Sequence, residues 1–440
     1  MSIISFRFLV FVLGLLIIYY IIPKKYRWTI LLLGSIIFYY LSSNKLILFV
    51  ILSTITIYLT GLILDKYNNT FNEFIIKYEE IHINPWHNIS KKDFIKKKEE
   101  LLNTMNVTDI YSFTYFMNYL IKILCGTTDA HTKFDMQSIL PINFRIINNE
   151  VLINYPNNLK GSTLISINDI NINNVLSELD KVITYGTKGK RIYELEKSLF
   201  NELLLFSIPS FRNDNELTFK IRKTNNETIT KVFKKKDHYE ETFNFNDYLY
   251  GNTGTYKIIN DTLIYNHRSI RQELESTINK SIDNLNKLDL TSINKIIIDL
   301  RGNLGGNSKL NKPLIEFLSK HKDKKLITLT DYRIFSGGRY TLIDLIILGS
   351  ITIGEGISTP LNCYGNSNSF TLNKYYNFIV SEMYFDPTRN IKIASKDDFN
   401  KLDKSILKEI IFKPDYYVTQ TKEDFINNKD SILEFAINLK

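Results

Sequence analysis

Apolar residues follow different patterns in successive parts of the chain, and each pattern predicts a different kind of structure. In residues 1–66 they form long runs without an internal charge, which is typical of membrane helices. From 67 to 136 they recur at helical spacing, which predicts a helical cap. From 137 to 245 short runs and turn residues predict a β-rich insert. From 246 to 440 buried-type strands alternate with helices, which predicts an α/β core.

The elements expected after residue 66 follow from this spacing. Ser90 is the expected N-cap of the second helix, because its side chain can accept a hydrogen bond from the first turn. Helices are expected over residues 71–80, 91–105, 109–124, 175–182, 191–204, 272–288, 339–348 and 431–439, and strands over 141–152, 217–222, 228–233, 263–267, 296–300 and 326–330.

The first 66 residues are expected to form a transmembrane anchor of two or three helices. Their apolar runs cover 8–22, 28–41 and 46–64. The third run approaches the ~20 residues that a spanning helix needs, whereas the first two need flanking residues to complete a span. This places the protein in the cell membrane as a multi-pass protein, with membrane lipid as a partner. Basic residues between the first two runs favour a cytoplasmic loop, but a re-entrant run would reverse the topology, so the side of the catalytic part stays open.

Charge and cysteine content exclude several function classes. The formal net charge is +9, and residues 1–66 contribute five of these charges. No basic stripe with interleaved aromatic residues is present, so nucleic acid is not expected as a partner. Cys125 and Cys363 are too few and too far apart for a disulfide framework or a structural zinc site. His82 and His87 lack a third ligand at a useful spacing and are expected to have loop or packing roles, so neither a metal nor a cofactor is expected.

Candidate chemistry follows two of the expected strands. The strand at 296–300 runs into the glycine-rich sequence RGNLGGN at 301–307, where glycines let the chain turn sharply and leave backbone N–H groups exposed. The strand at 326–330 leads to FSGG at 335–338, where a helix is expected to begin. These two turns together would place the Ser336 hydroxyl beside two backbone donors, which is the arrangement that acyl transfer needs.

A histidine suited to proton transfer follows the helix expected over 109–124. The sequence GTTDAHT at 126–132 contains His131. Histidine titrates near neutral pH, so it can take a proton from a serine hydroxyl and return it to a leaving amine. The separation from Ser336 is no objection, because such groups are assembled in space. The alternative is a histidine that caps a helix end.

Several motifs resemble the C-terminal processing peptidase family, which includes the tricorn core protease. Residues 299–306, DLRGNLGG, resemble the family's DLRxNxGG signature. Residues 335–338 stand where the family carries its nucleophilic serine, and IGE at 353–355 matches the strand that follows. The resemblance continues to a terminal PD element at 412–415 and covers about residues 70–440. It implies a ββα-spiral core shared with the crotonase and Clp-type folds.

Two further elements support the resemblance. Residues 129–132, DAHT, resemble the D-G-H-T element by which tricorn-like members supply a histidine base, with Ala130 in place of the usual glycine. Residues 161–170 resemble a strand and turn of a PDZ-like module, in which a peptide can add to a sheet edge. A purely structural insert is an equal alternative for this part.

The resemblance implies serine-type peptide hydrolysis. Ser336 would attack the scissile carbonyl, and His131 would act as general base and then as general acid. The N–H groups of Gly337 and of Gly305 or Gly306 would stabilise the oxyanion.

The acid that orients the histidine is less clearly marked. Processing-type members use a lysine base after the Gly-Glu pair, but residues 356–362 contain no lysine, which favours the histidine branch. Tricorn-like members place a glutamate seven residues before the aspartate of the PD element. Lys408 occupies that position here, so its neighbour Glu409 is the candidate acid. Asp129, Asp299 and Glu355 are expected to have structural roles.

The amino-terminal residues have a separate resemblance. Residues 5–9, 19–28 and 34–40 resemble the start of the membrane-bound O-acyltransferase family. Only the first helices of that family are matched, so the resemblance implies an anchor.

These observations predict a membrane-anchored, tail-specific type of serine peptidase that acts on a peptide or protein substrate. One alternative is a catalytically weak or inactive peptide-binding module of the same fold, which Lys408 and Ala130 support. Another is a remnant acyltransferase partner. A homo-oligomer stays open.

Overall fold

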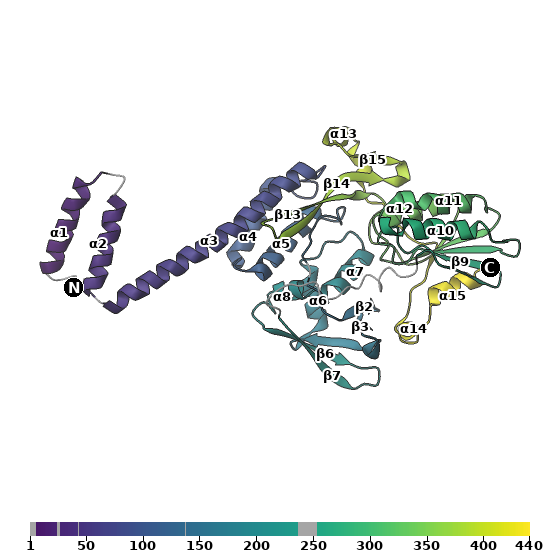
Figure 1. The fold of residues 1–440 in the computed structure, drawn as a ribbon, viewed down its shortest axis with the longest axis horizontal. Helices are drawn as coiled ribbons and strands as arrows, with labels where there is room; N and C mark the ends of the chain where they lie inside the picture. Colours follow the sequence, from purple (N-terminus) through teal and green to yellow (C-terminus); the bar gives the residue numbers. More distant parts are fainter. Residues whose placement is uncertain (1–5, 24–26, 43, 137, 236–252) are drawn as a thin grey trace. The chain divides into compact units, whose positions relative to one another are not determined.

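The computed structural model describes residues 6–23, 27–42, 44–136, 138–235 and 253–440 (Figure 1). The chain divides into two compact units, Met1–Asn69 and Thr70–Lys440. The expected boundary between the insert and the core, at residues 245 and 246, lies outside the described residues.

The smaller unit contains two apolar helices, α1 (Phe6–Ile21) and α2 (Arg27–Ser42), and the start of a long third helix, α3 (Asn44–Ile81). The rings of Phe8 and Phe38 meet edge to face, with centroids 5.4 Å apart. Gly34 permits close approach of the two helices, since a Cβ atom there would lie 2.4 Å from the Leu15 side chain.

The expected transmembrane helices are not supported. Across the described part of the chain, no helix combines the length and the apolar character needed to cross a membrane. Helices α1 and α2 have 16 residues each. At ~1.5 Å per residue each is about 24 Å long, which is shorter than the ~30 Å hydrocarbon core of a bilayer.

A six-stranded sheet forms the core of the larger unit, in the order β16-β12-β11-β10-β9-β8. Neighbouring strands from β9 to β16 are parallel, and β8 pairs antiparallel with β9. The strands are β8 (Tyr256–Ile259), β9 (Thr262–Asn266), β10 (Lys295–Asp299), β11 (Lys325–Thr330), β12 (Ile351–Gly354) and β16 (Tyr416–Tyr417).

Alternate residues of the sheet pack on opposite layers of helices. Ile296 and Ile298 contact the cluster that includes α10, α11 and α12, whereas Ile264 and Ile297 pack with Ile432 of α15. Figure 1 shows α10, α11 and α12 together on one side of the sheet and α15 on the other. The helices and 3-10 turns of this part are η3 (Gln272–Leu274), α10 (Glu275–Leu285), η4 (Ser308–Asn311), α11 (Lys312–Ser319), α12 (Gly337–Ile347), α14 (Lys422–Ile426) and α15 (Ser431–Asn438).

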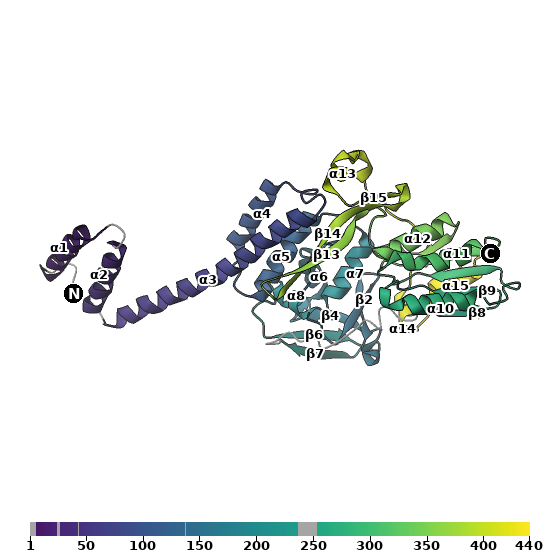
Figure 2. The same ribbon diagram turned by 45° about the horizontal axis from the view of Figure 1, so that its top comes forward.

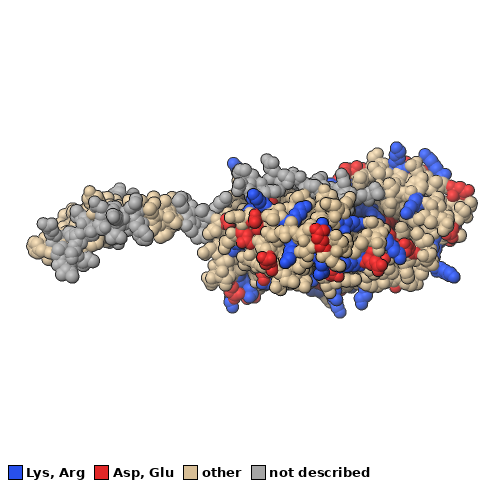
Figure 3. All heavy atoms as spheres, turned by 90° about the horizontal axis from the view of Figure 1, so that it is seen from below, with Lys and Arg blue, Asp and Glu red and all other residues tan. Residues whose placement is uncertain are grey.

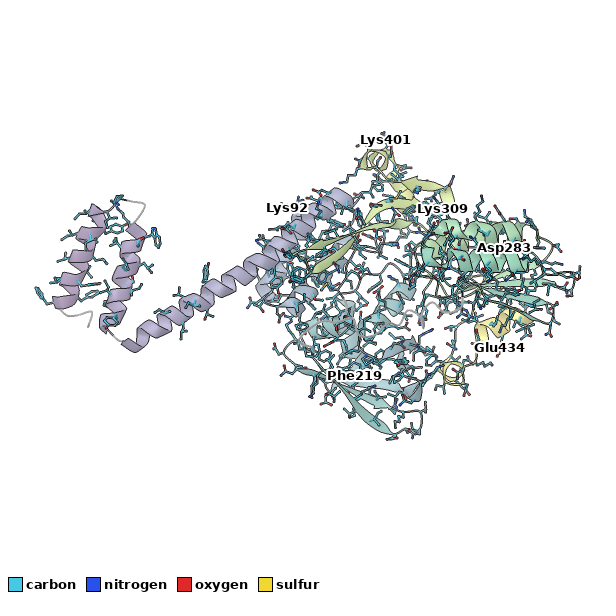
Figure 4. The ribbon with its side chains drawn as sticks, in the orientation of Figure 1. Lys92, Phe219, Asp283, Lys309, Lys401 and Glu434 are labelled. Atoms are coloured by element: carbon cyan, nitrogen blue, oxygen red, sulfur yellow. The ribbon has the colours of Figure 1, made fainter. Side chains whose placement is uncertain are left out.

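The β-rich insert is a second sheet, in the order β2-β3-β4-β6-β7, with β5 paired to β4. Phe219 of β6, labelled in Figure 4, is fully buried in its core. The helix expected over 191–204 is broken, because the Asn201 side chain caps a new helix there. The elements are β2 (Asn143–Ile147), β3 (Glu150–Tyr155), η2 (Asn157–Leu159), β4 (Thr163–Ile167), β5 (Ile170–Asn171), α6 (Ile172–Asp180), α7 (Lys188–Ser198), α8 (Glu202–Ser207), β6 (Glu216–Arg222) and β7 (Thr228–Lys234).

A third sheet joins β1, which follows the helical cap, to strands between residues 363 and 393. Strands β13 and β14 form a long antiparallel hairpin, and β1 pairs with β14. Figures 1 and 2 show this hairpin beside α5, where Phe113 and Tyr376 are in ring contact at 5.0 Å. The expectation that strands and helices alternate to the end of the chain is therefore wrong. The elements are α4 (Lys91–Thr104), α5 (Ile110–Cys125), β1 (Lys133–Phe134), β13 (Cys363–Leu372), β14 (Tyr376–Asp386), η5 (Pro387–Arg389), β15 (Ile391–Ile393), α13 (Lys396–Lys401) and η6 (Lys404–Leu407).

The parallel order of β10 and β11 has a direct consequence for the site. Carboxyl ends of parallel strands meet at one edge of a sheet, which is where such folds bind ligands. The glycine-rich turn after β10 and the turn with Ser336 after β11 therefore lie at the same edge.

On the face shown in Figure 3, basic and acidic side chains are interspersed over the described residues.

Candidate active site

Ser336 lies in a sharp turn directly before α12. Its backbone has φ 49° and ψ −120°, and its side chain makes no capping hydrogen bond to the helix. Non-glycine residues rarely adopt this conformation, and such strained residues concentrate at functional sites. The next two residues must be small. A Cβ atom added to Gly337 would lie 2.6 Å from the backbone oxygen of Gly306. A Cβ atom added to Gly338 would lie 2.5 Å from the backbone oxygen of Asn303.

The glycine-rich turn after β10 packs directly against Ser336. Gly305 has φ 98°, and a Cβ atom there would lie 2.5 Å from the Gly337 nitrogen and 2.9 Å from the Ser336 Cβ. Gly306 has φ 129° and approaches Ile270 closely, since its Cβ atom would lie 2.3 Å from the Ile270 oxygen. The sequence folds this way because glycine alone tolerates both the positive φ and the close approach.

The backbone donors predicted for the oxyanion are not equivalent. The Gly305 N–H donates to Asn303 Oδ1 at 2.9 Å, so it is already used within the turn. Among the described residues, the amides of Gly306 and Gly337 make no hydrogen bond. These two groups are the donors that the structure leaves beside Ser336.

His131 is held by ring packing and burial. Its ring stacks on Phe335, with centroids 4.4 Å apart. A Cβ atom at Gly365 would lie 3.3 Å from its Cε1, so the strand β13 backbone covers one edge of the ring. Within the described chain neither ring nitrogen makes a hydrogen bond. Burial lowers the pKa of His131 to about 4, helped by the charges of Arg339 and Lys190 and opposed by Asp129. The ring is therefore neutral at pH 7.

The segment that carries His131 is fixed by Asp129. The backbone N–H groups of His131 and Thr132 donate to Asp129 Oδ1 at 3.1 Å, and the Ser381 hydroxyl donates to it at 2.6 Å. His82 Nε2 lies 3.2 Å from Asp129 Oδ2. Burial alone would raise the pKa of Asp129, but its contact with His82 and the hydrogen bonds from Ser381 and Thr132 hold that pKa well below its usual range. The structural role expected for Asp129 is confirmed. His82, directly after the end of α3, contacts the Asp129 carboxylate and helps to hold it in place.

The structure does not bring Glu409 to His131. The Glu409 carboxylate accepts a hydrogen bond from the Thr127 hydroxyl. Asn362 fixes the backbone on both sides of Glu409, because its amide donates to the Lys408 oxygen at 2.9 Å and its oxygen accepts from the Ile410 N–H at 2.8 Å. The side chain consequently points elsewhere. No signal in the sequence reveals this clamp, since Asn362 is far from Glu409 along the chain.

Ser336 and His131 line one cavity of about 550 Å³ between the cap, the insert and the core. Buried Lys190 of α7 also lines it, with its ammonium 4.1 Å from the Phe335 ring centroid and 2.8 Å from Glu194 Oε1. Sequence reasoning missed Lys190 and Glu194, because a surface-type helical pattern gives no sign that its polar side faces a cavity. Among the described residues, no group of three or more His, Cys, Asp or Glu side chains is arranged to hold a metal.

Solved structures share this fold. The mature form of CPAF aligns with a TM-score of 0.57 over 86% of this chain and 96% of that chain, at 10% identity. CPAF complexed with lactacystin aligns with a TM-score of 0.58 over 86% of this chain and 97% of that chain, at 9% identity. The fold is that of CPAF. The photosystem II D1 C-terminal processing protease aligns with a TM-score of 0.36 over 80% of this chain and 93% of that chain, at 11% identity.

The similarity to CPAF confirms the expected mixed α/β architecture. The CPAF alignment gives no support to the acyltransferase resemblance of residues 1–66. No protein-family model matches the sequence, and no curated protein matches it.

Proposed function

We propose that this protein is a serine-type peptidase in which Ser336 is the nucleophile and His131 is the general base. One observation carries the proposal. Ser336, in its positive-φ turn, and His131, with both ring nitrogens unbonded among the described residues, line the same cavity. A peptide or protein is the proposed substrate.

The charge state of His131 suits the first step. Burial lowers its pKa to about 4, so the neutral ring can accept the Ser336 hydroxyl proton while the serine oxygen bonds to the substrate carbonyl carbon. The amides of Gly306 and Gly337 would donate to the resulting oxyanion. The imidazolium then gives its proton to the leaving amine as the C–N bond breaks. This step leaves the acyl group on Ser336. His131 then takes a proton from water as the water oxygen bonds to the acyl carbon, and it returns a proton to the Ser336 oxygen as the acyl–serine bond breaks.

A carboxylate is not required to orient His131 in this proposal. Stacking on Phe335 and the closeness of Gly365 fix the ring plane. Asp129 and the backbone of Tyr364 both favour the protonated ring, and the Tyr364 carbonyl is our candidate for the orienting acceptor. Catalytic hydrogen bonds are often long before substrate binds, so the Ser336 and His131 side chains would come into contact in the substrate complex.

The proposal is tested by hydrolysis of an unfolded protein substrate with the full chain. Wild type should cleave it, and Ser336→Ala and His131→Ala should each lose at least ~10³-fold in kcat/KM. Ser308→Ala is the matched control, because Ser308 is an exposed serine in η4 on the same core. Equal activity of wild type and Ser336→Ala would overturn the proposal.

A second function, binding of peptides without turnover, is favoured by the position of Glu409 against Thr127. If wild type binds peptides with unchanged affinity after Ser336→Ala and hydrolyses none of them, this function replaces the first.

We also propose membrane lipid as a partner of the smaller unit. Leu13, Ile17, Trp28 and Ile36 are between 42% and 65% exposed on α1 and α2. Full-length protein should float with liposomes, and the variant Leu13→Gln/Ile17→Gln should float less. Flotation unchanged by these substitutions would exclude this surface. Location at the cell membrane and assembly into a homo-oligomer stay predictions.

A further inference from the structure

A second cavity, of about 670 Å³, lies apart from the Ser336 cavity and is rich in arginine and lysine. The core contributes Arg268 after β9, Arg301 after β10 and Arg333 after β11. The insert contributes Arg145 of β2 and Lys160. The cavity therefore lies at the carboxyl edge of the parallel sheet, where α/β folds bind ligands.

Three carboxylates pair with the four arginines, namely Glu196, Asp299 and Asp430. Arg145 and Arg333 share Glu196, each at 3.5 Å. The same carboxylate also accepts from the Tyr332 hydroxyl at 2.6 Å and from the Ile146 N–H at 2.8 Å. Glu196 therefore neutralises one of its two guanidinium groups while its hydrogen-bonding capacity is used by other donors.

The second carboxylate is Asp299. It lies 2.8 Å from the Arg301 guanidinium and also pairs with Arg268. Arg301 has a further partner in Asp430, at 2.7 Å. Arg268 pairs with Asp299, which it shares with Arg301.

Two further acids in the wall, Asp331 and Glu355, accept hydrogen bonds from neighbouring groups, and the charge of Asp331 also helps to raise the pKa of Arg333. Asp331 accepts from the backbone N–H groups of Gly302 at 2.9 Å and Arg333 at 3.1 Å. Glu355 accepts from the Thr419 hydroxyl at 2.9 Å, and burial, helped by Asp331, raises its pKa. Six basic side chains line the cavity, Lys429 among them, against the three acidic side chains Asp331, Glu355 and Asp430, so its wall has a positive excess.

Unused donors accompany this excess. The Nε atoms of Arg268 and Arg333 are buried and have no hydrogen-bond partner among the described residues, and the buried Nε of Arg145 has only its 3.5 Å ion-pair contact with Glu196 Oε1. A buried N–H without an acceptor is unfavourable. A guanidinium presents its donors in a planar fork that matches the oxygens of a phosphate group.

We propose that this cavity binds a phosphate-bearing small molecule, with its phosphate held by Arg145, Arg268 and Arg333. A phosphate dianion compensates more of the positive excess than a single carboxylate does. The cavity is within the 300–1,000 Å³ range of small-molecule sites, so it has room for more than the phosphate. Tyr332, Tyr417 and Phe425 also line it and offer apolar surface to the rest of the ligand.

The site is connected to both turns of the candidate active site. Gly302 and Asp331 line the cavity and bond to each other, Gly302 begins the glycine-rich turn, and Asp331 starts the segment that ends at Ser336. A bound ligand would stabilise both turns together. The binding itself does not depend on the proposed peptidase function.

Binding is tested by calorimetric titration of the full chain, both wild type and Ser336→Ala, with inorganic phosphate and with pyrophosphate. Sodium chloride at matched ionic strength is the reference. Both phosphate compounds should bind both proteins and raise their Tm, whereas chloride should not. Arg145→Gln and Arg268→Gln should each weaken binding at least tenfold. Arg222→Gln, an exposed arginine at the end of β6, is the matched control and should bind as wild type does.

Absence of phosphate and pyrophosphate binding by folded wild type would overturn the proposal. Unchanged affinity in both cavity variants, or an equal loss in Arg222→Gln, would also overturn it. Circular dichroism identifies arginine variants that fail to fold. Lys160→Gln, at the partly exposed rim of the cavity, then replaces such a variant in the titration and should also weaken binding.

Discussion

His131 differs from a solvent-exposed histidine in how its protonation is controlled. Its ring lies against Phe335 and beside Gly365, away from water. The neutral form is therefore favoured over the imidazolium. This gives the candidate base a wider working range toward acid pH than an exposed histidine has.

Activity should reflect the low pKa of His131. Because the base acts when unprotonated, kcat/KM should stay level as pH falls from 7 to 5 and should fall as pH passes through about 4. The unfolded histidine titrates near the ordinary value of 6.5, so this group also contributes stability that is present above pH 6.5 and is lost as pH falls toward 4. A pH–rate profile measures the first effect, and an apparent pKa near 6.5 would contradict it.

The hydrogen bond from Ser381 to Asp129 should contribute measurably to stability. It is 2.6 Å long, fully buried and made to a carboxylate. Ser381→Ala should lower the free energy of unfolding by about 1.5–3 kcal/mol, the usual value for a hydrogen bond to a charged group. Urea denaturation measures it, and Ser308→Ala on the exposed η4 turn should change it by less than about 0.5 kcal/mol. A loss as small in Ser381→Ala as in Ser308→Ala would mean that this bond does not hold the His131 segment.

The residue-level site was only partly predictable from sequence. The motifs at 299–306 and 335–338 indicate two turns, and the structure places both beside one another. The sequence did not predict that the Gly305 N–H donates to Asn303 or that the Glu409 carboxylate accepts from Thr127. Each of these groups is oriented by a single hydrogen bond. Patterns of residue type do not report such bonds.

At the scale of elements, the site depends on the contact between the turns after β10 and β11. Gly305 and Gly337 approach so closely that neither position has room for a side chain. The turns consequently hold each other in place. Strain at one turn is expected to displace Ser336 in the other.

Gly305→Ala should abolish activity through this contact. Its φ of 98° costs an alanine about 1–2 kcal/mol, and the new Cβ would clash with the Gly337 nitrogen at 2.5 Å. Gly349→Ala is the matched control, because Gly349 has φ 86° but no atom within 4 Å of the new Cβ. Both variants should lose similar stability from the backbone, whereas hydrolysis should fall at least ~10²-fold in Gly305→Ala alone. Equal activities would show that the turns do not depend on each other.

Elements with strong periodicity were predicted from the sequence. Helices α4 and α5 and strands β9, β10 and β11 agree with expectation within a few residues, since their apolar residues form one face or one buried run. The hairpin of β13 and β14 was missed. Much of β13 is exposed and polar, and the turn uses Asn373 and Lys374 at positive φ instead of the glycine that marks most tight hairpins.

At the scale of the whole molecule, the chain divides into two compact units. Ser336, His131 and the residues that support them all lie in Thr70–Lys440. The larger unit also contains three sheets and their hydrophobic clusters. Of the side chains of α1 and α2 that the structure describes, none belongs to these clusters.

Removal of residues before Asn44 should therefore leave the larger unit folded. A variant beginning at Asn44 should keep the Tm of the main calorimetric transition within a few degrees and should keep kcat/KM within about twofold, since its core loses no buried side chain. Differential scanning calorimetry and a hydrolysis assay check both values. Loss of a cooperative transition would show that the smaller unit stabilises the larger one.

The most direct test of the central claim is labelling of the full chain with a fluorophosphonate, followed by mass spectrometry to locate the modified residue. An activated serine attacks this reagent as it attacks a carbonyl. The label should be found on Ser336 in wild type and Ser308→Ala, and it should be absent from Ser336→Ala and His131→Ala. Folded wild type that carries no label, or a label that persists in His131→Ala, would contradict a nucleophile activated by His131.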